Sequence, residues 1–207
     1  MEFLCLANSR KPPARCVAGL DLATGMWLRP VSDENNGGLS VNQALIQVDG
    51  RLRGIQPLDV VEFDKSQSLP GVGQPENVAR GQGEWVYKRR LFTSELVGLF
   101  ESNPYLLQDR YDRVLEQNSQ QVKSSLCLVS VTDPEFKLNP SNRDQLRAHF
   151  KFRNHEFNLA VTDDSTWVNQ AKIDARRFSQ GRWAFTVSLG TPFNGSLFKL
   201  VAWAHQY

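Results

Sequence analysis

Short apolar segments separated by turn-forming residues are the feature that most constrains the fold of this 207-residue chain. The first of them read EFLCLA, RCVAGLDL and GMWLRPV, with Pro12-Pro13 in one gap and Thr24-Gly25 in the other. Segments of this length and composition are typical of a β-meander. Further strands are expected at LIQVDGRL, DVVEFDK and EWVYKRRLF, while residues 65–83, rich in Gly, Pro, Gln and Ser, predict a long loop.

The chain begins this pattern twice. Leu-Cys-Leu at residues 4–6 returns at residues 126–128 and opens a second series of strand-like segments: SSLCLVSVTD, DQLRAHFKFRN, HEFNLAVTD, GRWAFTVSLG and SLFKLVAWAHQY. Five strands in about 100 residues is the size of an OB-type Greek-key barrel, and closing each sheet removes exposed strand edges. The sequence therefore predicts a mainly β protein of two tandem OB-like Greek-key β-barrels, in residues 1–118 and 119–207. A single larger β-sandwich is the alternative architecture.

A short helical segment is expected between the two barrels. In NPYLLQDRYDRVLEQ, Asn103 can cap a helix and Pro104 suits its first position. The apolar side chains that would share one stripe of this helix are Leu107, Tyr111, Val114 and Leu115. A shorter helix is expected over residues 94–101, and the polar stretch EQNSQQVKSS then separates the two halves.

Composition limits the class of protein. With 41% hydrophobic and 22% charged residues, the chain has the composition of a soluble globular protein. Its N-terminal apolar run ends at Asn8, too early for a signal peptide or a membrane span, so we expect a cytoplasmic protein without a membrane partner. Cys5, Cys16 and Cys127 match no metal-binding spacing and predict buried thiols. We expect no metal site and no cofactor.

Charge is distributed unevenly along the chain. Residues 1–116 contain 13 Lys and Arg against 15 Asp and Glu, a net charge of −2, whereas residues 117–207 contain 11 against 7, a net charge of +4. A basic half favours an anionic partner, although it is also common on ordinary soluble surfaces.

The segment QLRAHFKFRNHEFNLAVT predicts a basic stripe on one strand. Side chains alternate between the two faces of a strand, so one face is apolar and the other cationic. The cationic face would carry Arg147, His149, Lys151 and Arg153. On the second strand of an OB barrel, such a stripe would lie on the surface that binds oligonucleotides or oligosaccharides. The alternative is a solvated outer face.

The same segment also predicts a hairpin register. If Asn154-His155 forms a two-residue turn, Phe152 lies opposite Phe157 and Arg153 lies opposite Glu156.

A second basic group is expected near the N-terminus. The loop NSRKPPAR would carry Arg10, Lys11 and Arg15 to the mouth of a ligand groove. Trp27 and Arg29 lie two residues apart, so they would project from one strand face, where Trp can stack on a base while Arg binds its phosphate. Alternatively, Trp27 is a core residue and Arg29 pairs with an acid such as Asp33.

Two weaker basic-aromatic clusters are YKRRLF, which includes Lys88, and DARRFSQGRW, which includes Arg176, Arg177, Arg182 and Trp183. The chain contains no GxSxG elbow, no phosphate-binding GxxxxGK[ST] loop and no complete dinucleotide fingerprint. We therefore predict no catalytic residue.

The chain resembles the bacterial dual-OB-domain-containing proteins over residues 1–204. The resemblance rests on LCLANSRKPPARCVAGLDLATGMWLRPVS, PLDVVEFD, QPENV with Trp85, FNLAVTDDSTW and SLGTPFNGSLFKLVA. It implies a tandem OB architecture and an association with nucleic acid in defence or genome-conflict loci. It also implies a ligand pocket at the positions that match the family motif, which are Asn8, Ser9, Arg10, Lys11, Trp27, Arg29 and Pro30. The two prolines of NSRKPPAR depart from the glycine that such a loop often carries.

Together these observations predict a non-catalytic module that binds single-stranded nucleic acid or the end of a duplex. The predicted nucleic-acid-binding residues are Asn8, Arg10, Lys11, Arg15, Trp27, Arg29, Lys88, Arg147, Lys151, Arg153, Arg176, Arg177, Arg182 and Trp183. One alternative is a protein-interaction adaptor within a larger complex, which would expose a broad apolar patch. Another is a nucleotide-binding protein whose pocket brings Asn8, Arg10 and Arg29 together.

Overall fold

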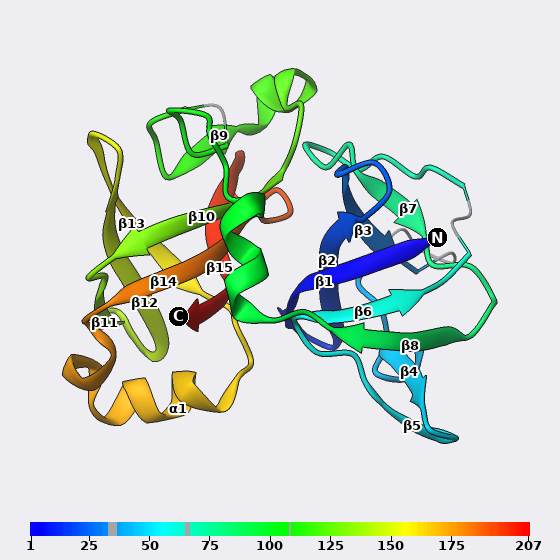
Figure 1. Ribbon diagram of the computed structural model, residues 1–207. Helices are drawn as coiled ribbons and strands as arrows, with labels where there is room; N and C mark the ends of the chain where they lie inside the picture. Colours follow the sequence, from blue (N-terminus) through cyan, green and yellow to red (C-terminus); the bar gives the residue numbers. More distant parts are fainter. Residues whose placement is uncertain (33–36, 65–66, 108) are drawn as a thin grey trace.

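The protein forms two β-sheets that lie side by side, as the computed structural model shows (Figure 1). The structure describes residues 1–32, 37–64, 67–107 and 109–207. The prediction of a mainly β protein built from two β units is confirmed. Each hydrogen-bonded path below is that of the described residues.

The first sheet has the strand order β5-β4-β8-β6-β1-β2-β3-β7. Its strands are β1 (Glu2–Lys11), β2 (Ala14–Asp21), β3 (Trp27–Val31), β4 (Leu45–Val48), β5 (Arg51–Gly54), β6 (Asp59–Glu62), β7 (Asn77–Ala79) and β8 (Trp85–Arg90). The β1-β2-β3 meander forms because each connection is a tight turn between apolar segments. Residues 67–83 are not wholly a loop, because β7 within them pairs in parallel with β3.

The second sheet has the strand order β10-β14-β15-β13-β12-β11, and β9 pairs with β15. Its strands are β9 (Arg113–Leu115), β10 (Leu126–Thr132), β11 (Glu135–Asn139), β12 (Asn142–Phe152), β13 (His155–Val161), β14 (Arg182–Leu189) and β15 (Ser196–Gln206). The two ends of this path, β10 and β11, are consecutive in the chain and are separated by a bend at Asp133, which has φ 48°. They act as one bent first strand, so β12 and β13 are the second and third strands of a five-stranded Greek-key unit.

The predicted helix at residues 103–117 is wrong. The structure has turns there, then β9, then the 3-10 helix η3 (Glu116–Gln121). The buried ammonium group of Lys199 determines this path, because it donates to the backbone oxygens of Leu106, Asp109 and Tyr111 at 2.6, 3.2 and 2.5 Å. The three oxygens converge on one ammonium group, an arrangement that the parallel carbonyls of a helix do not provide.

The other helical elements are short. The helix expected over residues 94–101 is the 3-10 helix η2 (Thr93–Leu99), and two further 3-10 helices are η1 (Asn42–Ala44) and η4 (Ala175–Phe178). The α-helix α1 (Thr166–Ile173) follows β13 and packs at one end of the second unit (Figure 1). No helix in the described parts of the chain is long and apolar enough to cross a bilayer.

The repeated Leu-Cys-Leu lies on the first strand of each unit and joins the two units. The leucines of both copies, Leu4, Leu6, Leu126 and Leu128, belong to one buried cluster that the two sheets share. Each cysteine faces the opposite way, into the core of its own unit. Burial raises the pKa of both thiols, that of Cys127 to about 12. The repeat therefore encodes an interface as well as two cores.

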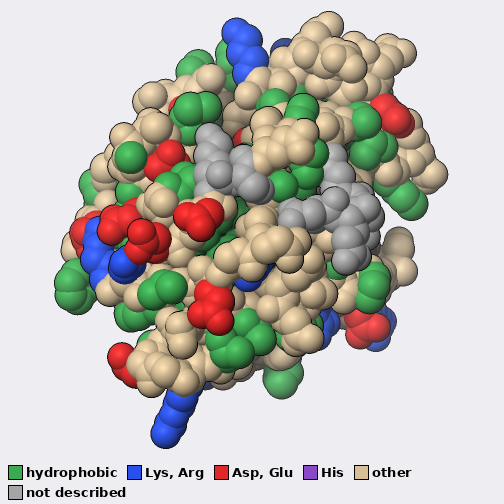
Figure 2. Space-filling model, turned by 90° about the vertical axis from the view of Figure 1, so that its right-hand side faces the viewer, with side chains coloured by type: hydrophobic (Ala, Val, Ile, Leu, Met, Phe, Trp, Pro, Cys, Tyr) green, Lys and Arg blue, Asp and Glu red, His purple; other side chains and the backbone are tan. Residues whose placement is uncertain are grey.

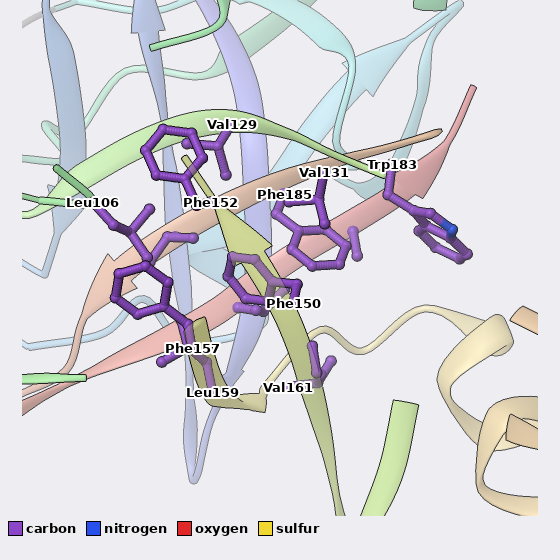
Figure 3. Packing of buried hydrophobic residues seen from close by; sticks show 14 of the residues in the cluster. Leu106, Val129, Val131, Phe150, Phe152, Phe157, Leu159, Val161, Trp183 and Phe185 are labelled. Carbon is purple, nitrogen blue, oxygen red and sulfur yellow. The ribbon is translucent and has the colours of Figure 1, made fainter. Parts of the chain in front are cut away.

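Aromatic side chains fill the core of the second unit (Figure 3). Phe150 and Phe157 stack with their ring centroids 5.8 Å apart, and Phe150 meets Phe185 edge-on at 5.2 Å. These residues come from β12, β13 and β14, so the apolar face of β12 is fixed toward the core and its other face must point outward.

The predicted register of the β12–β13 hairpin is wrong by one pair. Phe152 lies opposite His155 and Phe150 opposite Phe157, and the two turn residues are Arg153 and Asn154. Arg153 adopts φ 54° in this turn. The apolar faces still agree, because each residue's partner moves by two positions and side chains alternate with a period of two.

The division into domains at residues 118 and 119 stays a prediction. Leu106, Leu107 and Val114, on the N-terminal side of that point, pack into the core of the second unit.

Candidate nucleic-acid interface

The predicted basic loop NSRKPPAR is a β-hairpin rather than a loop. β1 continues to Lys11 and β2 begins at Ala14, so Pro12 and Pro13 alone form the turn. The backbone N–H of Arg10 donates to the carbonyl oxygen of Thr162 at 3.0 Å. The tip of the first unit's hairpin is therefore held against the chain that follows β13 in the second unit.

The two faces of this hairpin carry different predicted residues. Ser9 and Lys11 share one face with Cys16, and the three residues line a small cavity of about 100 Å³. Asn8 and Arg15 lie on the opposite face, where Arg15 Nε donates to Asn8 Oδ1 at 2.9 Å. Arg10 also lines the small cavity, but its side chain forms an ion pair with Asp164, so Lys11 is the cation that the hairpin contributes to this cavity.

The outward face of β11, β12 and β13 is basic but mixed. Lys137 lies opposite Arg147, and Lys151 lies opposite Glu156. Glu135 lies opposite His149, with 3.8 Å between Glu135 Oε2 and His149 Nδ1. A hydrogen bond from Lys137 lowers the pKa of Glu135, so this carboxylate stays charged.

Arg147 and Lys151 lie on this face. Arg147 Nε donates to Asn158 Oδ1 at 2.9 Å, its Nη2 donates to the carbonyl oxygen of Asn158, and its Nη1 lies 3.5 Å from Gln145 Oε1. Within the described part of the chain, neither Arg147 nor Lys151 forms an ion pair with a carboxylate. Arg153 is not on the strand face, because it lies in the turn with its guanidinium 5.7 Å from the ring of Phe152.

A groove joins Lys11 to Arg147. Arg147 lines a cavity of about 420 Å³ with Gln145, Asn158 and Phe193. This cavity and the small cavity of Lys11 share Gly190, Thr191 and Leu200, so the two cavities adjoin, and we call them together the inter-unit groove. Among the described residues that line the groove, Asp112 carries the one carboxylate, and it lines the cavity of Arg147 rather than that of Lys11. The groove follows the second and third strands of the second unit and the loop between its fourth and fifth.

Phe193 is the groove residue that the sequence reasoning missed. Its side chain is 65% exposed, although most large apolar side chains near it are buried. It precedes a turn in which Asn194 and Gly195 have φ 48° and 72°. The signal was present as FNG, because Asn-Gly marks a turn and an aromatic residue beside a turn lies at the surface.

Arg29 is buried, against the prediction that it contacts a phosphate. Its Nη2 lies 3.2 Å from Glu76 Oε1 and donates to the hydroxyls of Ser125 and Ser188 at 2.8 and 3.1 Å. The alternative, that Arg29 pairs with an acidic residue, is therefore correct, but that residue is Glu76. Asp33, the acid first considered, lies outside the described residues.

The two predicted stacking tryptophans also lie away from the groove. Trp183 is only 2% exposed and its Nε1–H donates to the carbonyl oxygen of Gln180 at 3.1 Å, so it cannot stack on a base. Trp27 is half-buried and lines a separate cavity of about 400 Å³ beside Met26 and Lys123.

The remaining predicted cations are spread over other surfaces. Arg182 begins β14 and the groove lies at the end of that strand, about 20 Å away. Arg176 and Arg177 precede Arg182, on η4. Lys88, on the first sheet, forms an ion pair with Glu62 that raises the pKa of Lys88. Figure 2 shows basic side chains scattered among acidic ones on the face of the first unit.

Residues 1–203 match the dual OB-containing domain. The chain belongs to this family. The match covers both sheets, and the topology of the second unit agrees with it. No curated protein and no solved structure matches the chain. OB domains commonly bind oligonucleotides or oligosaccharides across strands two and three and the adjoining loops. In this dual OB protein, the inter-unit groove occupies that surface of the second unit.

Proposed function

We propose that this dual OB protein binds single-stranded nucleic acid, or the frayed end of a duplex, in the inter-unit groove. The observation that carries the proposal is that the cavity of Lys11, on the first unit, adjoins the cavity of Arg147 and Phe193, on the second. A polymer is the ligand that needs such length, because a small molecule would occupy only one of the two cavities.

The groove offers the two kinds of contact that a single strand requires. Lys11 and Arg147 supply cations for phosphates, and Lys151 continues the cationic line along β12 beyond the cavity. Phe193 presents an exposed ring on which a base can stack, and Asn158 and Gln145 supply polar side chains beside it. Stacking tolerates any base, so we expect little sequence preference.

The test is fluorescence anisotropy with labelled single-stranded DNA and RNA at low and moderate salt. Replacing Phe193 with Ala should weaken binding by about 1–3 kcal/mol, the value of one stacked base. Arg147→Gln should weaken binding and reduce the slope of log K against log salt by about 0.7, as expected for one lost phosphate contact. Lys11→Gln should do the same from the other unit.

The matched control is Arg182→Gln, which removes an exposed arginine from the same sheet at the far end of β14. Its affinity should equal that of the unaltered protein. Absence of binding at micromolar protein in low salt would reject the proposal, and so would an equal loss in the Arg182 and Arg147 variants, because binding would then follow total charge rather than the groove.

The same proposal includes three finer points. We propose that the protein acts in the cytoplasm, that it binds without catalysis, and that it serves a bacterial defence or genome-conflict system. The family resemblance supports the last point. Growth of cells with and without the gene under phage challenge tests it, with Phe193→Ala as the binding-deficient comparison.

A further inference from the structure

A further cavity lies on the face of the β1–β2 hairpin that carries Asn8 and Arg15. It has a volume of about 560 Å³ and is lined by residues of both units, among them Asn8 and Arg15 from the hairpin and Arg53 and Arg90 from β5 and β8. The nucleic-acid groove and this cavity share no lining residue.

Two of the arginines depend on one buried carboxylate. Asp59 is completely buried, and Arg53 binds it with both terminal nitrogens, at 2.7 and 3.1 Å. Arg90 Nη1 donates to the same carboxylate at 3.2 Å. The guanidinium of Arg90 has five N–H donors and is half exposed, so most of its donors face the cavity or solvent. This cluster carries a net charge of +1.

A second cluster in the lining of the cavity repeats the arrangement. Asp164 accepts from Arg10 Nε and from Arg15 Nη1, both at 2.5 Å. Two arginines again share one carboxylate, so this cluster also has a net charge of +1. Asp163 lies behind the wall, where it accepts from the N–H of Ala204 and from Trp167 Nε1. The three arginines that line the cavity and the three carboxylates Asp59, Asp163 and Asp164 balance, and Arg10, which lines the neighbouring small cavity, brings the excess of one positive charge.

The remaining walls suit a planar, partly apolar group. Trp203 and His205 stack with their rings 5.6 Å apart and 11° from parallel, and both line the cavity with Leu58 and Ile55. The first turn of α1 contributes Thr166 and Trp167, so the positive end of the helix dipole adds to the arginines.

We propose that this cavity binds a small phosphate-bearing molecule of nucleotide size, with the phosphate held between Arg90 and Arg15. Arginine binds phosphate through charge-assisted hydrogen bonds. Arg15 donates Nε and Nη2 to Asn8 and Nη1 to Asp164, which leaves one N–H on each of its two terminal nitrogens for a ligand. The cavity is larger than one phosphate needs, and its remaining volume, beside the apolar side chains, suits the base of a nucleotide. The phosphate belongs to a free nucleotide or to the 5′ end of a strand, and the experiment distinguishes these two sources.

Isothermal titration calorimetry with AMP, inorganic phosphate and adenosine tests the site in the full-length protein. AMP should bind most tightly, phosphate more weakly, and adenosine not at all. Arg90→Gln should weaken AMP binding at least about tenfold, which corresponds to the loss of a charge-assisted hydrogen bond. In that variant the buried carboxylate of Asp59 still has Arg53 as an ion-pair partner. Arg15→Gln provides an independent test in the second cluster, since Asp164 still has Arg10 as an ion-pair partner.

The matched control is Arg89→Gln, the neighbouring residue on β8, whose side chain pairs with Glu95 outside the cavity. It should bind AMP within about twofold of the unaltered protein. A parallel comparison of 5′-phosphorylated and 5′-hydroxyl oligonucleotides identifies the source. If only the phosphorylated strand gains affinity, and Arg90→Gln removes that gain, the site binds strand ends.

The proposal is overturned if no phosphate-bearing probe shows binding that depends on Arg90 and Arg15, or if Arg89→Gln loses as much affinity as Arg90→Gln. These results are separable from failure of the groove, because Arg147→Gln should leave AMP binding unchanged and Arg90→Gln should leave the binding of 5′-hydroxyl strands unchanged.

Discussion

His205 shows how one side chain near the junction of the units responds to its surroundings. It is half-buried on β15, stacked on Trp203, with its Nε2 3.3 Å from the hydroxyl of Thr93. Burial lowers the pKa of His205, and the positive charge of Arg90 lowers it further, while Asp163 opposes both effects. The folded protein therefore favours the neutral imidazole.

This shift predicts a loss of stability in mild acid. Below about pH 6.5, the ordinary pKa of histidine, the unfolded chain takes up a proton more readily than the folded chain does. The free energy of unfolding should therefore decrease as the pH falls from 6.5 toward the lowered pKa, and this contribution should be fully present above pH 7. Urea denaturation at several pH values should show a smaller decrease for His205→Gln. Equal decreases in both proteins would contradict the assignment.

At the scale of the element, the β1–β2 ladder depends on a glycine. A Cβ atom at Gly19 would lie 1.8 Å from the carbonyl oxygen of Leu4, next to the register shift between Cys5 and Ala7. The backbone of Leu4 cannot move aside for a methyl group as a flexible side chain could. Gly19→Ala should lower the free energy of unfolding by at least about 2 kcal/mol.

Gly54→Ala is the control for this substitution. Gly54 is also in a strand of the first sheet, but a Cβ atom there would have no neighbour within 4 Å. Its effect should stay within about 0.5 kcal/mol. Urea denaturation of the two variants measures the difference, and similar midpoints would show that the ladder shifts to accommodate the methyl group.

The strands were more predictable than the helix expected at residues 103–117, for a physical reason. Apolar alternation and turn residues are local signals, so they located β1, β2 and β12. The helical pattern at residues 103–117 was equally regular. However, Leu106 and Leu107 pack in the core of the second unit, and Lys199, which is distant in sequence, binds the backbone oxygens of this segment. Tertiary contacts can override a local preference of this size.

The candidate site was predictable to a similar extent. Alternation correctly placed Arg147 and Lys151 on the outward face of β12. It could not show that Arg29 faces Glu76 of a distant loop, because both are brought together by the parallel pairing of β3 with β7. Nor could it show that Lys11 reaches the second unit, since that depends on how the two sheets pack.

At the scale of the whole molecule, the two units are joined by polar as well as apolar contacts. The shared leucine cluster is accompanied by a hydrogen bond from Thr186 Oγ1 to the carbonyl oxygen of Leu6, at 2.6 Å. Gln74 Nε2 likewise donates across the junction to the carbonyl oxygen of Leu189, at 3.1 Å. Both proposed sites lie at this junction, so their geometry depends on it.

The buried pair of Arg29 and Glu76, both in the first unit, also contacts the second unit, because Arg29 donates to the hydroxyls of Ser125 and Ser188. Their side chains are only 3% and 6% exposed, and Glu76 also accepts from Ser125 of the second unit. Removing one charge leaves the other buried without a partner, so Arg29→Met and Glu76→Leu should each lower the free energy of unfolding by about 3–5 kcal/mol. The double variant should lose clearly less than the sum, because neither charge is then left unpaired. The same cycle on the exposed pair Arg89 and Glu95, measured by urea denaturation, should give a coupling below about 1 kcal/mol. Equal coupling in both cycles would mean that burial does not strengthen the interaction between Arg29 and Glu76.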